Sequence, residues 1–201
     1  MGLSGKTIEE VSRFTAQPPL HPSHWNSVWV AVAFDLFVEP QTRAWYSIQP
    51  WPRDRHSMDL RRTPALTIVR NNIDLHAISS SGASDGGSTS NDASALPHPV
   101  SDMQGVVLID YLNSSSWGDA DALRELEERV QGQTAHALSI RPGEYGYAID
   151  TVYFIMAVGP RWRFGVRDAH GFRYLSDWYD LVRDVSTELA FDKLVDMVEK
   201  I

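Results

Sequence analysis

The 201-residue sequence predicts a single α+β domain, in which helices cover a mostly antiparallel or mixed β-sheet. Apolar runs typical of strands occur in both halves of the chain. Segments near the N-terminus, in the middle and near the C-terminus carry helical periodicity. The chain also contains seven residues each of Trp, Tyr and Phe, which supply ample apolar surface for one core.

The first elements in chain order are a short helix and an antiparallel meander. Thr7 is the expected N-cap of the helix, which Pro18-Pro19 ends. Residues 25–38 predict a central strand, because both faces of an extended chain would be apolar there. A turn at Asn71-Asn72 is expected between the last two strands. The four strands predicted in this half span residues 25–38, 43–48, 65–70 and 73–79.

Residues 79–99 interrupt the domain. They contain seven Ser and three Gly but no aromatic residue, Lys or Arg, so they lack the apolar surface needed to offset the entropy of ordering. Strand-like patterns lie on both sides, which favours a flexible loop inside one domain, 1–201, over a linker between two domains.

The second half predicts a strand, a central helix, a hairpin and a C-terminal helical region. The central helix spans 119–130 and stops at Gly132. Ser176 is the expected N-cap of the C-terminal region, which extends to Lys200 and shifts its apolar phase near Thr187. The strands expected here are 104–112, 145–158, 161–167 and 172–175, with a turn at Gly159-Pro160.

Composition excludes several classes of protein. Without cysteine, the chain has no disulfide, thiolate nucleophile or Cys-ligated metal. The apolar runs at 28–34 and 152–158 are far shorter than a membrane helix, and residues 1–17 lack the apolar stretch of a signal peptide. We therefore expect a cytoplasmic protein, or a nuclear one, without membrane attachment. The net charge of −8 disfavours long-range attraction to nucleic acid.

Arginines lie close to tryptophan in two segments, residues 51–62 and 161–167. Arg forks beside Trp rings suit contacts with carboxylates, phosphates or protein partners. Their alternative role is to pair with the acidic helices of the second half, where residues 176–201 hold seven acidic and three basic residues. The candidate binding residues are Trp51, Arg53, Arg55, Arg161, Trp162, Arg163 and Arg167.

Three carboxylates stand within apolar strand patterns: Asp35, Asp110 and Asp150. A carboxylate there is costly unless it is paired, hydrogen-bonded or protonated. If they shared a cleft, with or without His76, they could bind a divalent cation or act as general acid and base. The structural alternative is that each lies near a strand end or pairs with an arginine.

Other chemical signatures are weak. His21 and His24 are three residues apart, but Pro22 favours a turn over a helical metal site. His136 and His170 are further acid–base candidates with structural alternatives. The sequence contains no nucleophile elbow, phosphate-binding loop or zinc-protease motif, so no metal or cofactor is expected.

The leading hypothesis is a non-catalytic protein-interaction or assembly module that uses an Arg/Trp-rich surface and an acidic C-terminal helix, with a protein partner or self-association. The alternative is a small-ligand-binding protein or a metal or acid–base hydrolytic enzyme with a cleft lined by Asp35, Asp110 and Asp150. A third, weaker hypothesis is nucleic-acid binding through residues 51–62.

Overall fold

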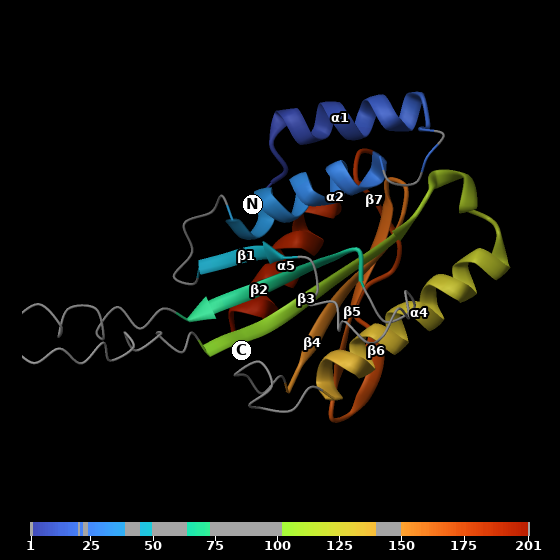
Figure 1. Cartoon of the computed structure of the whole chain (residues 1–201). Coiled ribbons are helices and arrows are strands. Elements are labelled where there is room, and N and C mark those ends of the chain that lie inside the picture. Colours follow the sequence, from blue (N-terminus) through green and yellow to red (C-terminus); the bar gives the residue numbers. More distant parts are fainter. Residues whose placement is uncertain are drawn as a thin grey trace, which may run out of the picture.

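The computed structural model confirms the expected α+β class. Its described residues form four α-helices and one mixed, seven-stranded sheet (Figure 1). The helices lie at the N-terminus, in the centre and at the C-terminus. The structure describes residues 2–19, 21, 24–38, 45–49, 64–72, 102–139 and 150–200.

The sheet has the strand order β1-β2-β3-β4-β5-β6, and β7 also pairs with β5. Strands β3 and β4 run parallel, whereas all other pairs are antiparallel. The strands are β1 (Trp45–Gln49), β2 (Leu66–Asn72), β3 (Asp102–Leu112), β4 (Val152–Val158), β5 (Arg161–Asp168), β6 (Gly171–Tyr174) and β7 (Tyr179–Asp180).

The crossover between the parallel strands contains helix α4 (Ala120–Ser139), as a parallel connection requires a long excursion. Asp119 begins the helix: its Oδ1 accepts the N–H groups of Asp121 and Ala122. The predicted stop at Gly132 is wrong, since the helix continues for two more turns. A helical glycine costs only about 1 kcal/mol, and burial of Thr134 and Ala137 beyond it offsets that cost.

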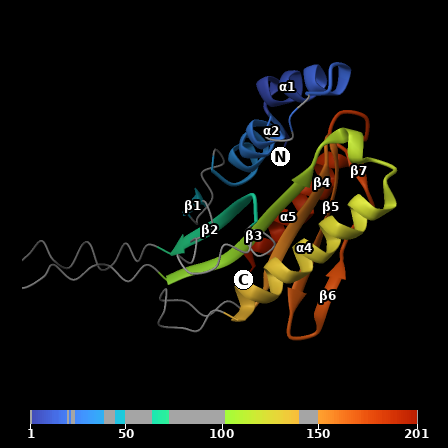
Figure 2. The ribbon, with the colours of Figure 1, turned by 45° about the vertical axis from the view of Figure 1, so that its right-hand side comes forward.

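Alternation along the central strands builds two separate cores. In β3, Val107 and Ile109 face one side of the sheet, whereas Leu108 faces the other. The first side packs against helices α1 (Gly5–Ala16), α2 (His24–Ala33) and α5 (Thr187–Glu199), and the second against α4. Figure 2 shows α4 running along one face of β3–β5 while α5 lies behind the sheet.

The prediction of a central strand at 25–38 is wrong. These residues form α2 and a short π-helical segment, Phe34–Val38, so β1 pairs with β2 instead. The buried positions repeat at the spacing of a helix face, while the remaining positions are also largely apolar and hide that period. The buried side chains are Trp25, Val28, Trp29, Val32, Ala33, Asp35, Leu36 and Phe37.

Helix starts differ from the predictions at both ends of the chain. Ser4, rather than Thr7, caps α1, and its Oγ accepts the N–H of Thr7. Ser176 does not begin a helix, because its Oγ accepts the N–H of Phe164 in β5. The chain then forms β7 and a turn, and α5 starts only at Thr187, where the apolar phase shifts.

Several strand boundaries also shift. Strand β2 runs through Asn71-Asn72, where a turn was expected, and β4 starts at Val152, with Asp150 and Thr151 outside it. The predicted turn at Gly159-Pro160 is confirmed: Gly159 has a φ of 58°, and its N–H donates to the Leu112 carbonyl. The predicted strand at 73–79 and loop at 79–99 lie outside the described residues.

Among the residues that the structure describes, no helix combines the length and apolar character needed to cross a bilayer.

Candidate functional site

The arginines of β5 define the first candidate surface. The alternation predicted for this strand is confirmed: Trp162 and Phe164 are buried in the core shared with α5. Arg161 and Arg163 project to the opposite side, where they contact aromatic rings beside α4.

These two arginines and three aromatic rings form a continuous series of contacts. The Arg161 guanidinium lies 4.1 Å from the ring centre of Trp117, and Trp117 meets Trp178 edge to face at 5.1 Å. Arg163 lies 4.7 Å from Trp178 and 3.5 Å from Tyr174. We call these five residues the arginine–aromatic cluster. Stacking of a guanidinium on aromatic faces is favourable, and most strongly so when the pair is desolvated.

Arg163 is the electrostatic centre of this cluster. Its side chain is only 18% exposed, and its Nη2 lies 3.7 Å from Oε2 of Glu127 on α4. Burial lowers the pKa of the Arg163 guanidinium and raises the pKa of the Tyr174 phenol. The charge of Arg163 is therefore compensated by aromatic faces and a carboxylate within the protein.

The other predicted binding residues of β5 also serve the fold. Arg167 donates through Nη1 to the Gln131 carbonyl, at 3.1 Å, and so ties β5 to α4. The Trp162 ring is fully buried and stacks on Phe191 of α5 with ring centres 4.1 Å apart. Trp162 thus belongs to the core and offers no surface to a partner.

A shallow pocket of about 210 Å³ lies at the edge of the cluster. Arg161 and Arg183 contribute cations to it, whereas Asp180 and Asp184 contribute carboxylates, so the formal charges of its lining cancel. Asp180 Oδ1 accepts the N–H groups of Val182 and Arg183, and the Asp180 N–H donates to Asp184 Oδ2. The pocket is consequently part of a well-ordered turn rather than a concentrated anion site.

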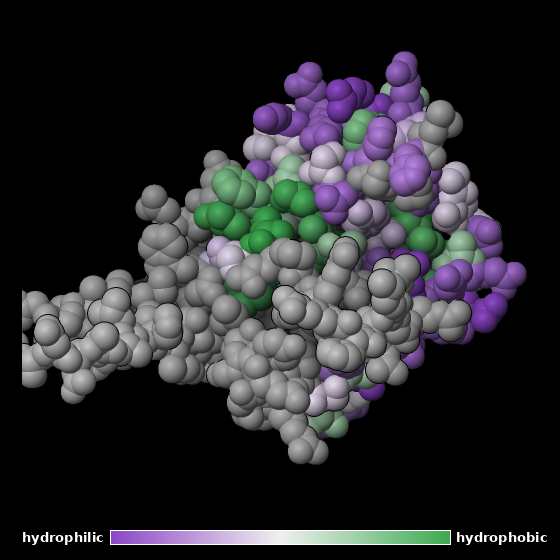
Figure 3. All heavy atoms as spheres, in the orientation of Figure 1, coloured by the Kyte–Doolittle hydropathy of each residue, from purple (hydrophilic) through white to green (hydrophobic). Residues whose placement is uncertain are grey.

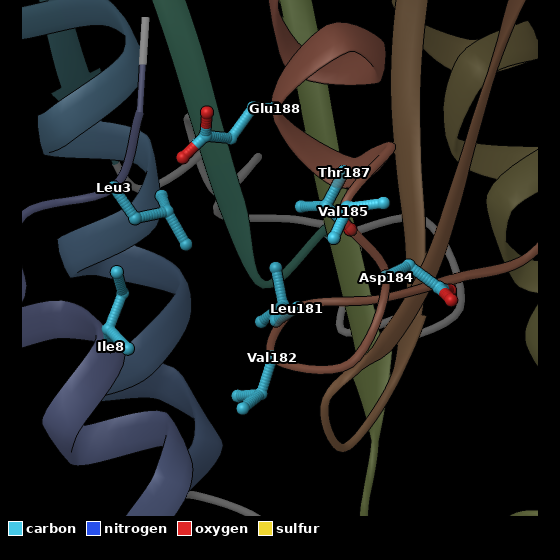
Figure 4. Close-up of a pocket in the computed structure, with 8 residues that line it drawn as sticks. All are labelled: Leu3, Ile8, Leu181, Val182, Asp184, Val185, Thr187 and Glu188. Atoms are coloured by element: carbon cyan, nitrogen blue, oxygen red, sulfur yellow. The ribbon is translucent and has the colours of Figure 1, made fainter.

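A second, more apolar hollow of about 280 Å³ lies on the other side of this turn. Leu3 and Ile8, at the start of α1, face Leu181 and Val182 across it (Figure 4). We call this hollow the apolar groove. Its full lining is Leu3, Ile8, Leu181, Val182, Asp184, Val185, Thr187 and Glu188.

Exposed aliphatic side chains concentrate at this groove. Among the described residues, five large hydrophobic side chains are exposed. Three of them line the groove, Ile8 (40%), Val182 (42%) and Val185 (95%), and a fourth, Leu189 (71%), directly follows the lining residue Glu188 in α5. The fifth, Phe34 (48%), follows α2, over which Figure 3 shows apolar residues gathering, whereas α1 is mainly hydrophilic. A concentration of exposed apolar residues is typical of a binding surface.

The charges that line the groove are acidic. Asp184 and Glu188 belong to its lining, which contains no Lys, Arg or His. Figure 4 shows the Glu188 side chain reaching toward Leu3, whereas the Asp184 carboxylate points away. Glu188 is exposed and makes no hydrogen bond or ion pair with the described residues. One carboxylate is thus available at the rim.

The three candidate aspartates occupy different surroundings. Asp35 is buried beside α1, where its Oδ2 accepts the Ser4 N–H at 2.8 Å. Asp110 lies on the α4 side of the sheet, and Asp150 is exposed before β4. Since Asp35 and Asp110 contact elements on opposite faces of the sheet, they do not line one cleft.

Asp110 is the most completely satisfied of these carboxylates. Arg129 donates to it through Nε and Nη2, both at 2.9 Å, and Gln133 donates through Nε2 at 2.8 Å. Its Oδ1 also accepts the N–H of Tyr111. This buried ion pair fixes α4 on the sheet, which is the structural alternative that the sequence left open.

The structure does not test the remaining candidates. Trp51, Arg53, Arg55 and His76 lie outside the described residues. In the described part of the chain, no three His, Asp or Glu side chains are placed to hold a metal ion.

Sequence reasoning did not identify the apolar groove. Leu181, Val182 and Val185 fall within the helical region predicted from Ser176, but the structure has no helix at those positions. The phase shift near Thr187 was the available signal, because it separates these residues from α5. The contribution of Leu3 and Ile8 depends on packing between the two ends of the chain and has no local signature.

Comparisons with protein-family models, with curated proteins and with solved structures found no match to this chain.

Proposed function

We propose that this protein is a non-catalytic protein-interaction or assembly module whose docking surface is the apolar groove together with Leu189. One observation carries the proposal: four of the five exposed large hydrophobic side chains in the described residues lie at this surface. Burial of such side chains in a partner is the main favourable term in protein association.

The shape of the groove supports a protein partner over a small ligand. Small-molecule sites are typically concave cavities of about 300–1,000 Å³ with several convergent polar groups. The groove, at about 280 Å³, lies at the lower end of this range, and its apolar residue Val185 stands almost entirely in solvent. Such a surface suits a few side chains of a larger molecule, with the protruding valine and leucine contacting its flanks.

The arginine–aromatic cluster helps to hold one wall of the groove in place. Trp178 is held by Arg163 and Trp117, and the Leu181 N–H donates to the Pro160 carbonyl at 2.9 Å. The wall that carries Leu181 and Val182 is therefore anchored to β5 before a partner arrives. A pre-ordered wall lowers the entropic cost of binding.

The test compares the double variant Val185→Ser/Leu189→Ser with Phe34→Ser, which removes an exposed apolar side chain elsewhere. Each full-length protein carries a photo-crosslinking residue in place of Ser12, which lies in α1. It is then exposed to a lysate of its source cells. Quantitative mass spectrometry then identifies the captured proteins. We expect one set of crosslinked partners for the wild type and Phe34→Ser, and its loss for the double variant.

Thermal unfolding and circular dichroism of all three proteins establish that they are folded. The proposal fails if the folded double variant captures the same proteins as the wild type in the same amounts. Sedimentation equilibrium detects self-association in parallel, since assembly through the groove would also be abolished by the double substitution.

A further inference from the structure

We infer that the apolar groove receives an amphipathic helical segment of a second protein, with basic residues flanking its apolar face. This inference rests on the proposed function and specifies the chemistry of the partner.

The elements around the groove favour a helix over an added strand. One wall is the start of α1, and the other is the turn that leads into α5. Binding by strand addition needs an unpaired sheet edge, and neither wall is a strand. A helix instead inserts apolar side chains at positions i, i+3 or i+4, and i+7, which suits a short groove with Leu3 and Ile8 facing Leu181 and Val182.

The charges favour basic flanks on that helix. Glu188 has no partner among the described residues, whereas the Asp184 carboxylate points away from the groove and accepts the Asp180 N–H. The exposed face of α5 continues with Asp196. Two cations lie nearby: Arg183 lines the neighbouring pocket, and Lys6 lies about 160° around the α1 axis from Ile8. The net charge of −8 adds a favourable long-range field for a basic partner.

The same charges disfavour a second copy of this chain as the occupant. A two-fold symmetric contact across the groove would place Glu188 and the acidic face of α5 near their own duplicates. Like charges across an interface cost binding energy and suppress the wrong partner. A basic helix meets the same rim with opposite charge.

The experiment selects binders from a displayed library of random 16-residue peptides on the immobilised full-length protein. Selected peptides are then tested on the folded Val185→Ser/Leu189→Ser and Phe34→Ser variants. We expect peptides with a net positive charge and apolar residues at i, i+3 or i+4, and i+7. Their affinity should fall at least tenfold for the double variant and stay unchanged for Phe34→Ser.

A matched pair of charge variants tests the acidic rim. Glu188→Gln should weaken the selected peptides roughly two- to fivefold at low salt, the effect of one partly screened ion pair. Glu125→Gln removes an exposed acid from α4, which packs on the other face of the sheet, and should leave the affinity nearly unchanged. High salt should abolish the difference between the wild type and Glu188→Gln.

The outcomes separate the two proposals. If no selected peptide loses affinity for the double variant, the proposed function is overturned together with this inference. If peptides depend on the groove but are neutral or acidic, or lack helical spacing, the docking surface stands and the basic-helix inference is overturned. A dimer of the wild type that dissociates in the double variant also overturns the inference, because it makes the occupant a second copy.

Discussion

The arginine–aromatic cluster and the apolar groove lie on either side of one turn. The side chains of the cluster contact one another, whereas several side chains at the groove are exposed to solvent. In the cluster, Arg163 contacts Tyr174, Trp178 and Glu127, so its charge is compensated within the fold. In the groove, Val185 and Leu189 are mostly exposed. Only the groove leaves apolar surface for another molecule to cover.

This difference shows why residue types alone do not identify an interface. Arg and Trp are enriched in binding sites because they offer large contacts with fixed geometry, but these properties also suit them to hold one protein together. Aliphatic side chains carry no such signature in sequence. Their exposure becomes visible only when the fold is known.

The largest expected effect concerns the core residue Trp162, which stands between the two cluster arginines in β5 but faces the opposite side of the sheet. Trp162→Ala should lower the free energy of unfolding by about 3–5 kcal/mol, because it leaves a cavity against Phe191. Leu189→Ala, in the docking surface, should change the free energy of unfolding by no more than about 0.5 kcal/mol. Urea unfolding measures both values. Similar losses of unfolding free energy for the two variants would contradict the distinction between the buried core and the exposed docking surface.

The buried ion pair gives the next largest effect. Arg129→Met should cost about 3 kcal/mol of unfolding free energy, since it removes two hydrogen bonds from the buried Asp110 carboxylate. Replacing both residues, as Asp110→Leu/Arg129→Met, should recover most of the loss. Arg124→Met is the control on the same helix: its two ion pairs are exposed, and the melting temperature should not change. An unaltered Arg129→Met protein would argue against a structural role for the pair.

Within the cluster, Arg163→Met should cost about 1–2 kcal/mol of unfolding free energy. The substitution keeps most of the apolar stem but removes the guanidinium from the faces of Tyr174 and Trp178. Arg183→Met removes an exposed guanidinium from the turn beside the cluster and should leave thermal unfolding unaltered. Equal melting temperatures for both variants would show that the cluster contributes no stability.

The smallest effect concerns an ion pair at the exposed end of the β5–β6 hairpin. Hydrogen bonds from Arg173 lower the pKa of the Asp168 carboxyl from 3.8 to about 2. A folded-state pKa below the unfolded value stabilises the protein above pH 3.8, and this contribution is lost as the pH falls toward 2. Carboxyl NMR titration should give a midpoint near 2 that moves toward 3.8 in Arg173→Met. An ordinary midpoint in the wild type would rule out the ion pair in solution.

The parts of the fold that the sequence predicts well are those with a single dominant period. Strand β5 alternates apolar and charged residues, and both its existence and the inward direction of Trp162 follow from that pattern. The apolar run in β3 and the start of α4 at Asp119 are equally local features. In each case a local residue pattern or a helix cap decides the structure.

The errors arise where the local pattern is ambiguous or tertiary contacts decide. Residues 25–38 are apolar at nearly every position, so the helical period of Trp25, Val28 and Val32 is hidden by the residues between them. The helical pattern after Ser176 is overridden because its hydroxyl pairs with Phe164 and β7 extends the sheet. The groove depends on contacts between distant segments, which no window of sequence contains.

The two walls of the groove come from residues 3–8 and 181–188, almost the full length of the chain apart. A chain still emerging from the ribosome therefore has one wall long before it has the other. The docking surface is complete only after the turn that leads into α5 has packed against the start of α1. A partner that needs both walls would distinguish chains in which these two segments have come together from partly folded ones, so binding itself would report that this step of folding had taken place.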